Sequence, residues 1–315
     1  MLNPFLQRAR CFPLKLIVDI HSFCNARCTM CPYPQYAPRQ SQGQMPWLLY
    51  RKIVDEMAQI GQNHHFTPMM TYCYMGEPFL AEDLAHHVRY GRDKGIDIYL
   101  NTNAEAMSPA QVDALLAADF SGKIHISFHG ITKEVFQRIC GLDYDHTLNN
   151  VHYLLGRYDP RRICIRGVDD NWPGGEKQRW QDYWRQWPVE LEYLRPISRC
   201  GGVGRLLPNN LKNKEKVRLY GCRYHHPLVE MVILFDGRAV MCCQDMAREL
   251  IWGDVSGQGI LGVWNSPLRT EAVRKLYSGA PSERSFICAR CEQALDAAGW
   301  VHSLAQATWR KLTAG

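Results

Sequence analysis

The sequence predicts an α/β fold: a partial (β/α)6 TIM-like barrel followed by a small C-terminal domain built from a β-hairpin and helices. Two observations lead to this prediction. Short β-like runs alternate with helix-like stretches through the first two-thirds of the 315 residues, and the character of the sequence changes after a segment rich in Gly, Pro and Asn at residues 199–213. Strands that alternate with helices form a parallel sheet with helices outside it. The carboxyl ends of such strands are the expected place for a functional site.

The expected elements follow in chain order. We expect strands at residues 14–21, 67–74, 96–101, 123–129, 161–168 and 189–195. We expect helices between them at residues 48–61, 82–94, 109–118, 132–155 and 176–186. In the C-terminal part, two apolar runs flank Asp236-Gly237 and predict a β-hairpin over residues 229–242. Helices are expected at residues 266–278 and 291–312, and the domain boundary divides the chain into residues 1–205 and 206–315.

Three of the expected strands have one polar face. The side chains that share a polar face are Asp97, Tyr99 and Asn101, then Lys123, His125, Ser127 and His129, then Arg162, Cys164 and Arg166. A parallel strand that is buried on both faces is apolar throughout. We therefore expect these faces to line a wet cavity inside the barrel, with solvated edge strands as the alternative.

The composition excludes several classes of protein. Hydrophobic residues make up 46% and charged residues 22%, as in globular proteins. No apolar segment approaches the roughly 20 residues of a membrane span, and residues 1–10 lack the long apolar run of a signal peptide. We expect a cytoplasmic protein with no membrane partner. The net charge of +6 comes from dispersed residues, which favours a solvated surface over a nucleic-acid partner.

The thirteen cysteines are clustered, and in a cytosolic chain clustered cysteines indicate metal or redox sites. The first strand runs into Cys24-Asn-Ala-Arg-Cys28-Thr-Met-Cys31, a CxxxCxxC pattern. Zinc is one alternative, but structural zinc sites have four ligands, usually from paired CxxC units. Three closely spaced thiolates favour an iron–sulfur cube in which one iron keeps an open position.

This pattern resembles the radical S-adenosylmethionine (SAM) superfamily, and the resemblance extends over nearly the whole chain. It implies that Cys24, Cys28 and Cys31 hold a catalytic [4Fe–4S] cluster whose open iron binds SAM. An external one-electron reductant of the flavodoxin or ferredoxin type then allows reductive cleavage of SAM to a 5′-deoxyadenosyl radical, which abstracts hydrogen from the substrate. Met30 stands where the family often has an aromatic residue, which leaves the ligands untouched.

Further residues resemble SAM-contacting positions of the family. Met75-Gly76-Glu77-Pro78 follows the second strand and resembles the GGEP element, although Met75 replaces its first glycine. The resemblance implies that Glu77 accepts from the ammonium group of SAM. The remaining positions with a family counterpart near SAM are Asn101, Asn103 and Ser127.

The C-terminal cysteines resemble the opening of the SPASM domain, which binds auxiliary iron–sulfur clusters. Cys222 precedes Gly237 and Cys242, and Cys288 and Cys291 form a CxxC unit with no cysteine after it. This departure from the full pattern implies one auxiliary [4Fe–4S] cluster, as in shortened "twitch" relatives. Cys243 competes with Cys242 as the second ligand, and a zinc ribbon is the alternative site.

The predicted reaction is oxidation of a small polar molecule, such as a sugar, an aminocyclitol or a nucleoside, with dehydrogenation and epimerisation as possible outcomes. Dehydrogenation needs a base, for which Arg166, His125 and His129 are candidates, and epimerisation needs a thiol, for which Cys164 is a candidate. One alternative is a peptide- or protein-modifying radical SAM enzyme similar to those that mature ribosomal peptides. The other is a non-catalytic zinc or electron-transfer protein.

Overall fold

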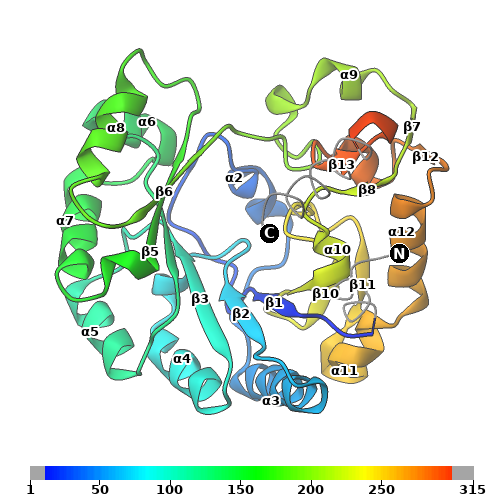
Figure 1. Cartoon of the computed structure of the whole chain (residues 1–315), viewed down its shortest axis with the longest axis horizontal. Helices are drawn as coiled ribbons and strands as arrows, with labels where there is room; N and C mark the ends of the chain where they lie inside the picture. The colour runs from blue at the N-terminus through cyan, green and yellow to red at the C-terminus, as the bar shows by residue number, and fades with distance from the viewer. Residues whose placement is uncertain (1–10, 300–315) are drawn as a thin grey trace, which may run out of the picture.

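The computed structural model describes residues 11–299 and contains one central nine-stranded sheet, in the order β11-β10-β9-β1-β2-β3-β4-β5-β6 (Figure 1). The predicted strands are β1 (Lys15–Val18), β2 (Met69–Tyr72), β3 (Asp97–Thr102), β4 (Ile124–Ser127), β5 (Ile163–Val168) and β6 (Glu190–Leu194). Each pairs in parallel with the next. The α/β prediction is confirmed. In the described residues the sheet ends at β6 and β11, so the barrel is open.

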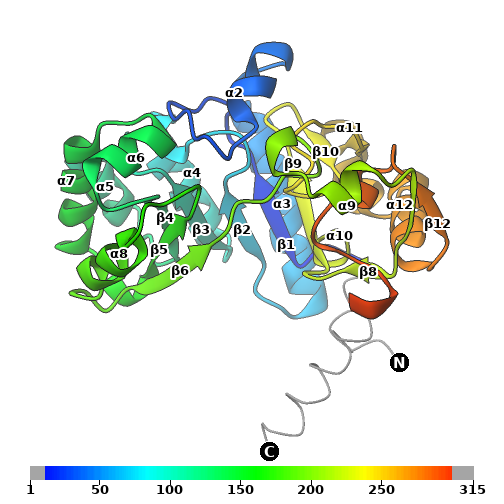
Figure 2. The same cartoon turned by 90° about the horizontal axis from the view of Figure 1, so that it is seen from above.

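Helices cover the outer side of the curved sheet (Figures 1 and 2). They are α3 (Trp47–His64), α4 (Leu84–Asp93), α5 (Pro109–Ala117), α6 (Lys133–Cys140), α7 (Tyr144–Leu155) and α8 (Glu176–Trp184). The single helix expected over residues 132–155 is wrong, because Gly141 adopts a positive φ of 68° and ends α6. Asp143 then caps α7 by accepting from the backbone N–H of His146 at 2.8 Å.

The predicted split into two faces is confirmed by burial for β3 and β4, but not for the first half of β5, where Cys164 is as buried as Ile163 and Ile165. Residues of β3 and β4 alternate between partly exposed and buried. The fully buried side chains turn towards the helices: Ile98, Leu100, Ile124, Ile126, Ile163 and Ile165. Their burial stabilises the sheet–helix interface through the hydrophobic effect, which leaves the polar side chains on the opposite, concave face.

The C-terminal part extends the same sheet on the far side of β1. β9 (Glu230–Ile233) pairs in parallel with β1, β10 (Arg238–Val240) pairs antiparallel with β9, and β11 (Ile251–Asp254) follows β10. The β9–β10 hairpin confirms the hairpin prediction, and Gly237 supplies the positive φ of 91° in its turn. Helices α10 (His226–Val229), α11 (Val255–Trp264) and α12 (Pro267–Tyr277) belong to this part, the last at its predicted place.

Short elements complete the chain. Two small antiparallel sheets pair β7 (Lys216–Arg218) with β12 (Pro281–Glu283), and β8 (Gly221–Cys222) with β13 (Ala294–Leu295). The helix expected over residues 291–312 is wrong at its start, because residues 294–295 form β13 and pair with β8; residues 300–312 lie outside the described part. The remaining short helices are α2 (Tyr33–Tyr36), η1 (Ala37–Arg39), η2 (Pro78–Leu80), η3 (Pro160–Arg162), η4 (Gly204–Leu206), α9 (Asn209–Lys212) and η5 (Ile287–Arg290).

Within residues 11–299, no helix is both long enough and apolar enough to cross a membrane. The expectation for residues 1–10 concerns a segment outside the described residues.

Candidate active site and cluster sites

The loop between β1 and α2 carries the three N-terminal cysteines. It is attached to the end of α6 by two backbone hydrogen bonds, from Arg27 N to Cys140 O at 2.8 Å and from Thr29 N to Ile139 O at 2.9 Å. Because this loop directly follows a central strand, it lies at the carboxyl edge of the sheet, where barrel sites are built.

The thiols of this loop are set in protein rather than in bulk solvent. Burial raises the pKa of Cys24 to about 12 and the pKa of Cys31 to about 11. A hydrogen bond with the Cys140 thiol, together with burial, raises the pKa of Cys28 well above its ordinary value. The bare thiols are therefore protonated at neutral pH, and metal binding would release protons.

The spacing of these sulfurs fits a cluster better than a single metal ion. In a tetrahedral zinc site with Zn–S bonds of about 2.3 Å, the sulfurs lie roughly 4 Å apart. Groups whose ligand atoms all lie within 4.8 Å of one another occur elsewhere in the described residues, but the three cysteines of this loop do not form one. Three thiolates spread over a larger volume suit a multi-iron cluster.

Gly76 brings the loop after β2 against β1. A Cβ at this position would lie 1.9 Å from the backbone oxygen of His21, so a side chain requires the backbone to move. Asp19, at the end of β1, accepts from the backbone N–H groups of Met75 at 3.3 Å and Gly76 at 3.0 Å. Burial raises the pKa of Asp19 to about 7.

The Glu77 carboxylate connects the ends of β2 and β3. It accepts from the Thr102 hydroxyl at 2.6 Å, the Asn103 backbone at 2.7 Å and the Phe79 backbone at 3.2 Å. Burial raises the pKa of Glu77 to about 7. Pro78 begins η2, which Glu77 caps. Both carboxylate oxygens are thus used within the protein, and the expected contact of this group with an ammonium stays a prediction.

Asn103 links this network to the cysteine loop. Its Nδ2 lies 3.9 Å from Cys24 Sγ and donates to Asn25 Oδ1 at 2.9 Å. The loops after β1, β2 and β3 are therefore one connected structure. The structure brings together the residues that the sequence assigned to the first cluster and to the GGEP-like element.

A polar network lies on the concave face of β4, β5 and β6. Arg166 is the neighbour of Ser127 on β4 and of Glu192 on β6. Its guanidinium donates from Nε to Glu192 Oε2 and from Nη2 to His125 Nδ1. Because a guanidinium only donates, His125 Nδ1 accepts and the ring carries its proton on Nε2. Burial and the positive charge of Arg166 lower the pKa of His125 to about 4.

The neighbours of His125 complete this face. Asn101 lies beside it on β3 and Cys164 beside it on β5. Ligand atoms of His125, Cys164 and Glu192 lie within 4.8 Å of one another, as in a metal site. The Arg166 guanidinium already bonds to two of the three, so it supplies the positive charge there. Cys164 is fully buried, and burial raises its pKa to about 12.

His129 bonds to the backbone of β5 rather than to the side chains of the polar network. It follows the end of β4, is buried, and its Nδ1 accepts from the backbone N–H of Val168 at 3.2 Å. Burial lowers its pKa to about 4. One ring nitrogen is therefore engaged in holding β4 against β5.

The four C-terminal cysteines line one cavity, together with a fifth. The cavity is bounded by Cys200, Cys222, Cys242, Cys288 and Cys291. No three of these five sulfurs, all within the described residues, gather as closely as single-ion ligands, so the donor set again fits an iron–sulfur cluster. Cys243 does not line this cavity; its sulfur lies with His226 and Glu230.

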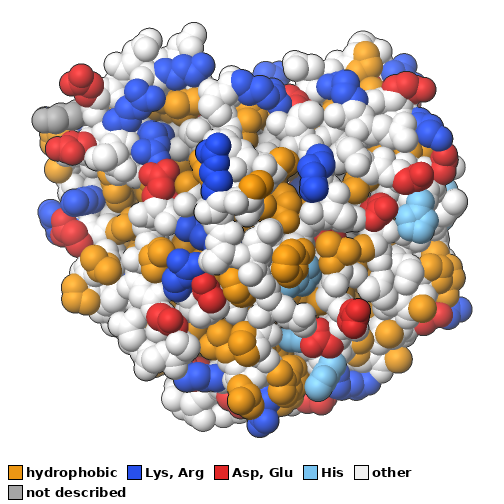
Figure 3. Space-filling model, turned by 180° about the vertical axis from the view of Figure 1, so that it is seen from behind, with side chains coloured by type: hydrophobic (Ala, Val, Ile, Leu, Met, Phe, Trp, Pro, Cys, Tyr) orange, Lys and Arg blue, Asp and Glu red, His pale blue; other side chains and the backbone are white. Residues whose placement is uncertain are grey.

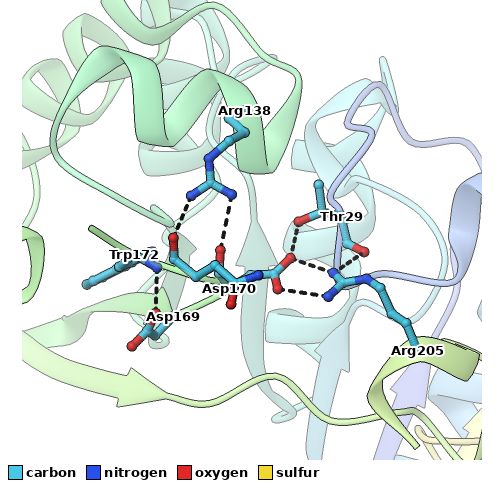
Figure 4. A network of polar contacts seen from close by, with 7 residues as sticks. Thr29, Arg138, Asp169, Asp170, Trp172 and Arg205 are labelled. Atoms are coloured by element: carbon cyan, nitrogen blue, oxygen red, sulfur yellow. Dashed lines mark hydrogen bonds and ion pairs between the residues drawn. The ribbon is translucent and has the colours of Figure 1, made fainter. Parts of the chain in front are cut away.

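The Asp170 carboxylate fastens the cysteine loop to the linker that leads to the C-terminal part (Figure 4). It accepts from Arg205 Nη1 at 3.0 Å and Nη2 at 2.6 Å, and from the Thr29 hydroxyl. Arg205 also donates to Thr29 O at 3.0 Å, while Arg138 of α6 donates to Asp170 O at 3.2 Å. A second connection joins the loop after β2 to the C-terminal part, where the Tyr74 hydroxyl donates to Asp245 O.

Several of these residues were not found from the sequence. Glu192 lies in the expected strand at residues 189–195. Glu190 and Glu192 are two residues apart and so share one face of that strand, a pattern from which a polar face could have been predicted. Asp170 and Cys200 lie in loops and Arg205 lies in the one-turn helix η4, where no periodicity marks the direction of a side chain. Their positions depend on how distant segments pack.

Two family models match the chain. The radical SAM superfamily model matches residues 18–168, and the SPASM model, an iron–sulfur cluster-binding domain, matches residues 222–292.

Two curated proteins show sequence similarity. The S-adenosyl-L-methionine-dependent 2-deoxy-scyllo-inosamine dehydrogenase of Niallia circulans is 20% identical over 275 residues, which are 87% of this chain and 90% of the relative. The AdoMet-dependent heme synthase of Methanosarcina barkeri is 25% identical over 144 residues, which are 45% of this chain and 39% of the relative.

Solved structures share the fold. BtrN in complex with AdoMet and 2-DOIA has a TM-score of 0.58 at 16% identity, with 90% of this chain and 94% of that chain covered. Streptococcus suis SuiB bound to the precursor peptide SuiA has a TM-score of 0.63 at 14% identity, with 84% and 68% covered. The anSMEcpe structure with bound AdoMet has a TM-score of 0.63 at 13% identity, with 96% and 99% covered. The chain contains a radical SAM domain and a C-terminal SPASM domain, and its cofactors are SAM, a catalytic [4Fe–4S] cluster and an auxiliary [4Fe–4S] cluster.

Proposed function

We propose that this radical SAM enzyme is an oxidoreductase that acts on a small polar molecule with several hydroxyl or amino groups, such as an aminocyclitol, a sugar or a nucleoside. The observation that carries the proposal is the charged network of Arg166, His125 and Glu192 on the concave face of the sheet. A site that combines a guanidinium, a carboxylate and a neutral imidazole has donors and acceptors for hydroxyl and amino groups. The 20% identity to an aminocyclitol dehydrogenase supports the same substrate class.

The cysteines divide between the two clusters. We infer that Cys24, Cys28 and Cys31 hold the catalytic cluster, and that Cys222, Cys242, Cys288 and Cys291 hold the auxiliary cluster. When bound, the catalytic cluster and SAM supply a radical that removes a hydrogen atom from the substrate. Gly76, Glu77 and Pro78 shape the loop beside SAM, with Asn101, Asn103 and Ser127 as further contacts. We retain residues 1–205 and 206–315 as the two functional parts of the chain.

Arg166 orients the substrate in this proposal. Its Nε and Nη2 are taken by Glu192 and His125, so the remaining N–H groups are the ones that can donate to a substrate hydroxyl. Arginine stays charged and is a poor base. The neutral His125 and the Glu192 carboxylate are the better proton acceptors, and His129, whose Nδ1 already accepts from the backbone, is the weaker candidate.

Dehydrogenation and epimerisation make different demands on the protein. Dehydrogenation requires loss of a proton and of a second electron, for which the polar network and the auxiliary cluster are suited. Epimerisation requires a thiol that returns a hydrogen atom, and Cys164 remains protonated because burial raises its pKa to about 12. We favour dehydrogenation, since the curated relative is a dehydrogenase and Cys164 is fully buried.

The proposed macromolecular partner is a one-electron reductant of the flavodoxin or ferredoxin type. A nucleic-acid partner is not part of the proposal. On the face in Figure 3, positive and negative side chains are interspersed with apolar ones. A continuous basic stripe would be expected for phosphate binding.

Product analysis tests the proposal. The reconstituted enzyme is given SAM, a reductant and a panel of aminocyclitols, amino sugars and nucleosides, and 5′-deoxyadenosine and oxidised product are quantified by mass spectrometry. We expect at least one panel member to raise 5′-deoxyadenosine formation at least about tenfold above the substrate-free rate, with one ketone formed per SAM cleaved. A product with one solvent-derived hydrogen and unchanged mass in ordinary water identifies epimerisation instead.

The alternative substrate is a peptide, as in the peptide-bound structure of SuiB, whose fold this chain shares. The same assay with cysteine- and serine-containing peptides distinguishes the two. Stimulation by peptides alone contradicts the small-molecule proposal, and no SAM cleavage with any reductant contradicts the enzymatic assignment.

A further inference from the structure

The auxiliary site holds one more thiol than a cubane cluster has irons. Cys222, Cys242, Cys288 and Cys291 come from β8, from the segment after β10 and from the CxxC unit, whereas Cys200 comes from the linker between β6 and β7. A [4Fe–4S] cluster accepts four protein thiolates. One of the five is therefore in excess when the cluster is bound.

The linker is built so that Cys200 faces this cavity. Cys200 is only 5% exposed and has a positive φ of 56°, a conformation that is unfavourable for a residue with a side chain. Its carbonyl accepts from Arg290 Nε at 3.0 Å. The backbone N–H of Ser198 donates to Glu292 Oε1 at 2.6 Å, and the Ser198 hydroxyl accepts from Gly201 N at 3.0 Å. The linker is thus held by the two residues on either side of Cys291.

Cys200 is the partner of one particular ligand. Its thiol is in hydrogen-bond contact with the thiol of Cys291. The terminal ligands of a cubane point outward from different corners, so thiolates on different irons are farther apart than two sulfurs in contact. Cys200 and Cys291 are therefore directed at the same corner of the cluster.

We propose that Cys200 and Cys291 are interchangeable ligands of one iron of the auxiliary cluster. In the exchange, the bond from iron to Cys291 sulfur breaks and a bond to Cys200 sulfur forms. The Cys200 proton passes to the Cys291 thiolate across their contact, and no electron is gained or lost. The inference rests on the ligand set proposed above for the auxiliary cluster.

The surroundings of Cys200 give this corner an approach from outside. On its other side Cys200 borders an open cleft lined by Tyr36, Leu207, Glu249, Arg284 and Arg290. None of the four proposed ligands lines this cleft. Cys200 thus lies between the cysteine cavity and an open cleft, so rearrangement at this ligand is less hindered by packing than in a close-packed interior.

Iron content in single and double variants tests the exchange. All variants carry Cys24→Ala, Cys28→Ala and Cys31→Ala, so that iron reports on the auxiliary site alone. The parent should bind about four iron and four sulfide per chain. We expect Cys200→Ala and Cys291→Ala each to keep at least about three-quarters of this iron, and the Cys200→Ala/Cys291→Ala double variant to lose at least about fourfold.

Cys222→Ala is the matched control, because the thiol of Cys200 is paired with Cys291. It should lose iron as fully as the double variant. If it does not, the proposed ligand set is wrong, which is a different failure from that of the exchange. Loss of iron in Cys291→Ala equal to that of the double variant refutes the exchange, and so does an unchanged double variant or a complete loss in Cys200→Ala. Cys291→Ser serves if Cys291→Ala does not fold, as judged by circular dichroism.

Discussion

Replacing Asp170 with alanine should loosen the catalytic cysteine loop without touching any cysteine. The buried Asp170 carboxylate accepts two hydrogen bonds from Arg205 and one from the Thr29 hydroxyl. Thr29 lies between Cys28 and Cys31, so this carboxylate connects the loop to the linker, next to the direct hydrogen bond from Arg205 to Thr29 O (Figure 4). The substitution leaves the main-chain contact with Arg138 in place.

The size of the effect follows from these bonds. A hydrogen bond to a charged group contributes about 1.5–3 kcal/mol. The Arg205 side chain is 47% exposed, so water compensates part of its loss. We therefore expect Asp170→Ala to weaken the attachment of the loop by about 2–4 kcal/mol. This corresponds to an increase of about 30- to 700-fold in the population of the detached loop.

Chelation kinetics measure this population. The reconstituted protein is mixed anaerobically with an iron chelator, and release of the catalytic cluster is followed by absorbance. We expect Asp170→Ala to lose about half of its iron, the catalytic share, at least tenfold faster than the unsubstituted protein. Asp182→Ala on the exposed surface of α8 is the matched control and should release iron at the normal rate. Equal release rates for Asp170→Ala and this control would refute the reasoning.

Three further predictions concern other parts of the site. Gly76→Ala should weaken SAM binding at least about tenfold in equilibrium dialysis. The reason is that the Cβ of the new alanine would lie 1.9 Å from the backbone oxygen of His21. Gly174→Ala is the control and should bind SAM normally, because the space around Gly174 is open. Arg269→Met should lower the free energy of unfolding of the apoprotein by about 2–4 kcal/mol in urea titration. The buried guanidinium donates to the carbonyls of Trp264 and Pro227 and lies 3.4 Å from the centre of the Trp264 ring. A change below about 0.5 kcal/mol would contradict this prediction. His125 has its pKa lowered to about 4, so its neutral form is present above that pH and is lost as pH falls through 4. Any kcat/KM inflection near pH 7 is expected to come from Asp19 and Glu77, whose pKa values burial raises to about 7, so His125→Gln should leave it unchanged. Arg166→Lys should lower kcat/KM about 100-fold; loss of that inflection in His125→Gln or a change below threefold in Arg166→Lys would contradict the proposed network.

The periodicity of the sequence predicted the inner strands because burial imposes it locally. Ile98 and Leu100 alternate with Tyr99 and Asn101, and a strand with this pattern has one apolar and one polar face wherever it lies. The hairpin at Asp236-Gly237 was predictable for a similar reason, since Gly237 supplies the positive φ of the turn.

The errors arose where local propensity competed with longer-range structure. The helix expected over residues 132–155 has apolar residues at helical spacing on both sides of Gly141, so periodicity alone did not reveal the break at that glycine. After Cys291, the chain pairs with β8 instead of continuing as a helix, because the small sheet satisfies its backbone groups beside the cysteine cavity.

The sequence by itself predicted the two cysteine sites, the cofactors and the succession of strands β1 to β6, whereas the pairing of β9 with β1 in the same sheet came only from the structure. Cys24, Cys28 and Cys31 lie within eight residues, so their meeting at one site requires only a loop. Tertiary structure decided which distant residues join them. Asp170 and Thr29 are separated by 141 positions, and Cys200 meets Cys291 through a linker whose direction no pattern encodes. Spacing within a loop is local information, whereas contacts between loops depend on the packing of the whole sheet.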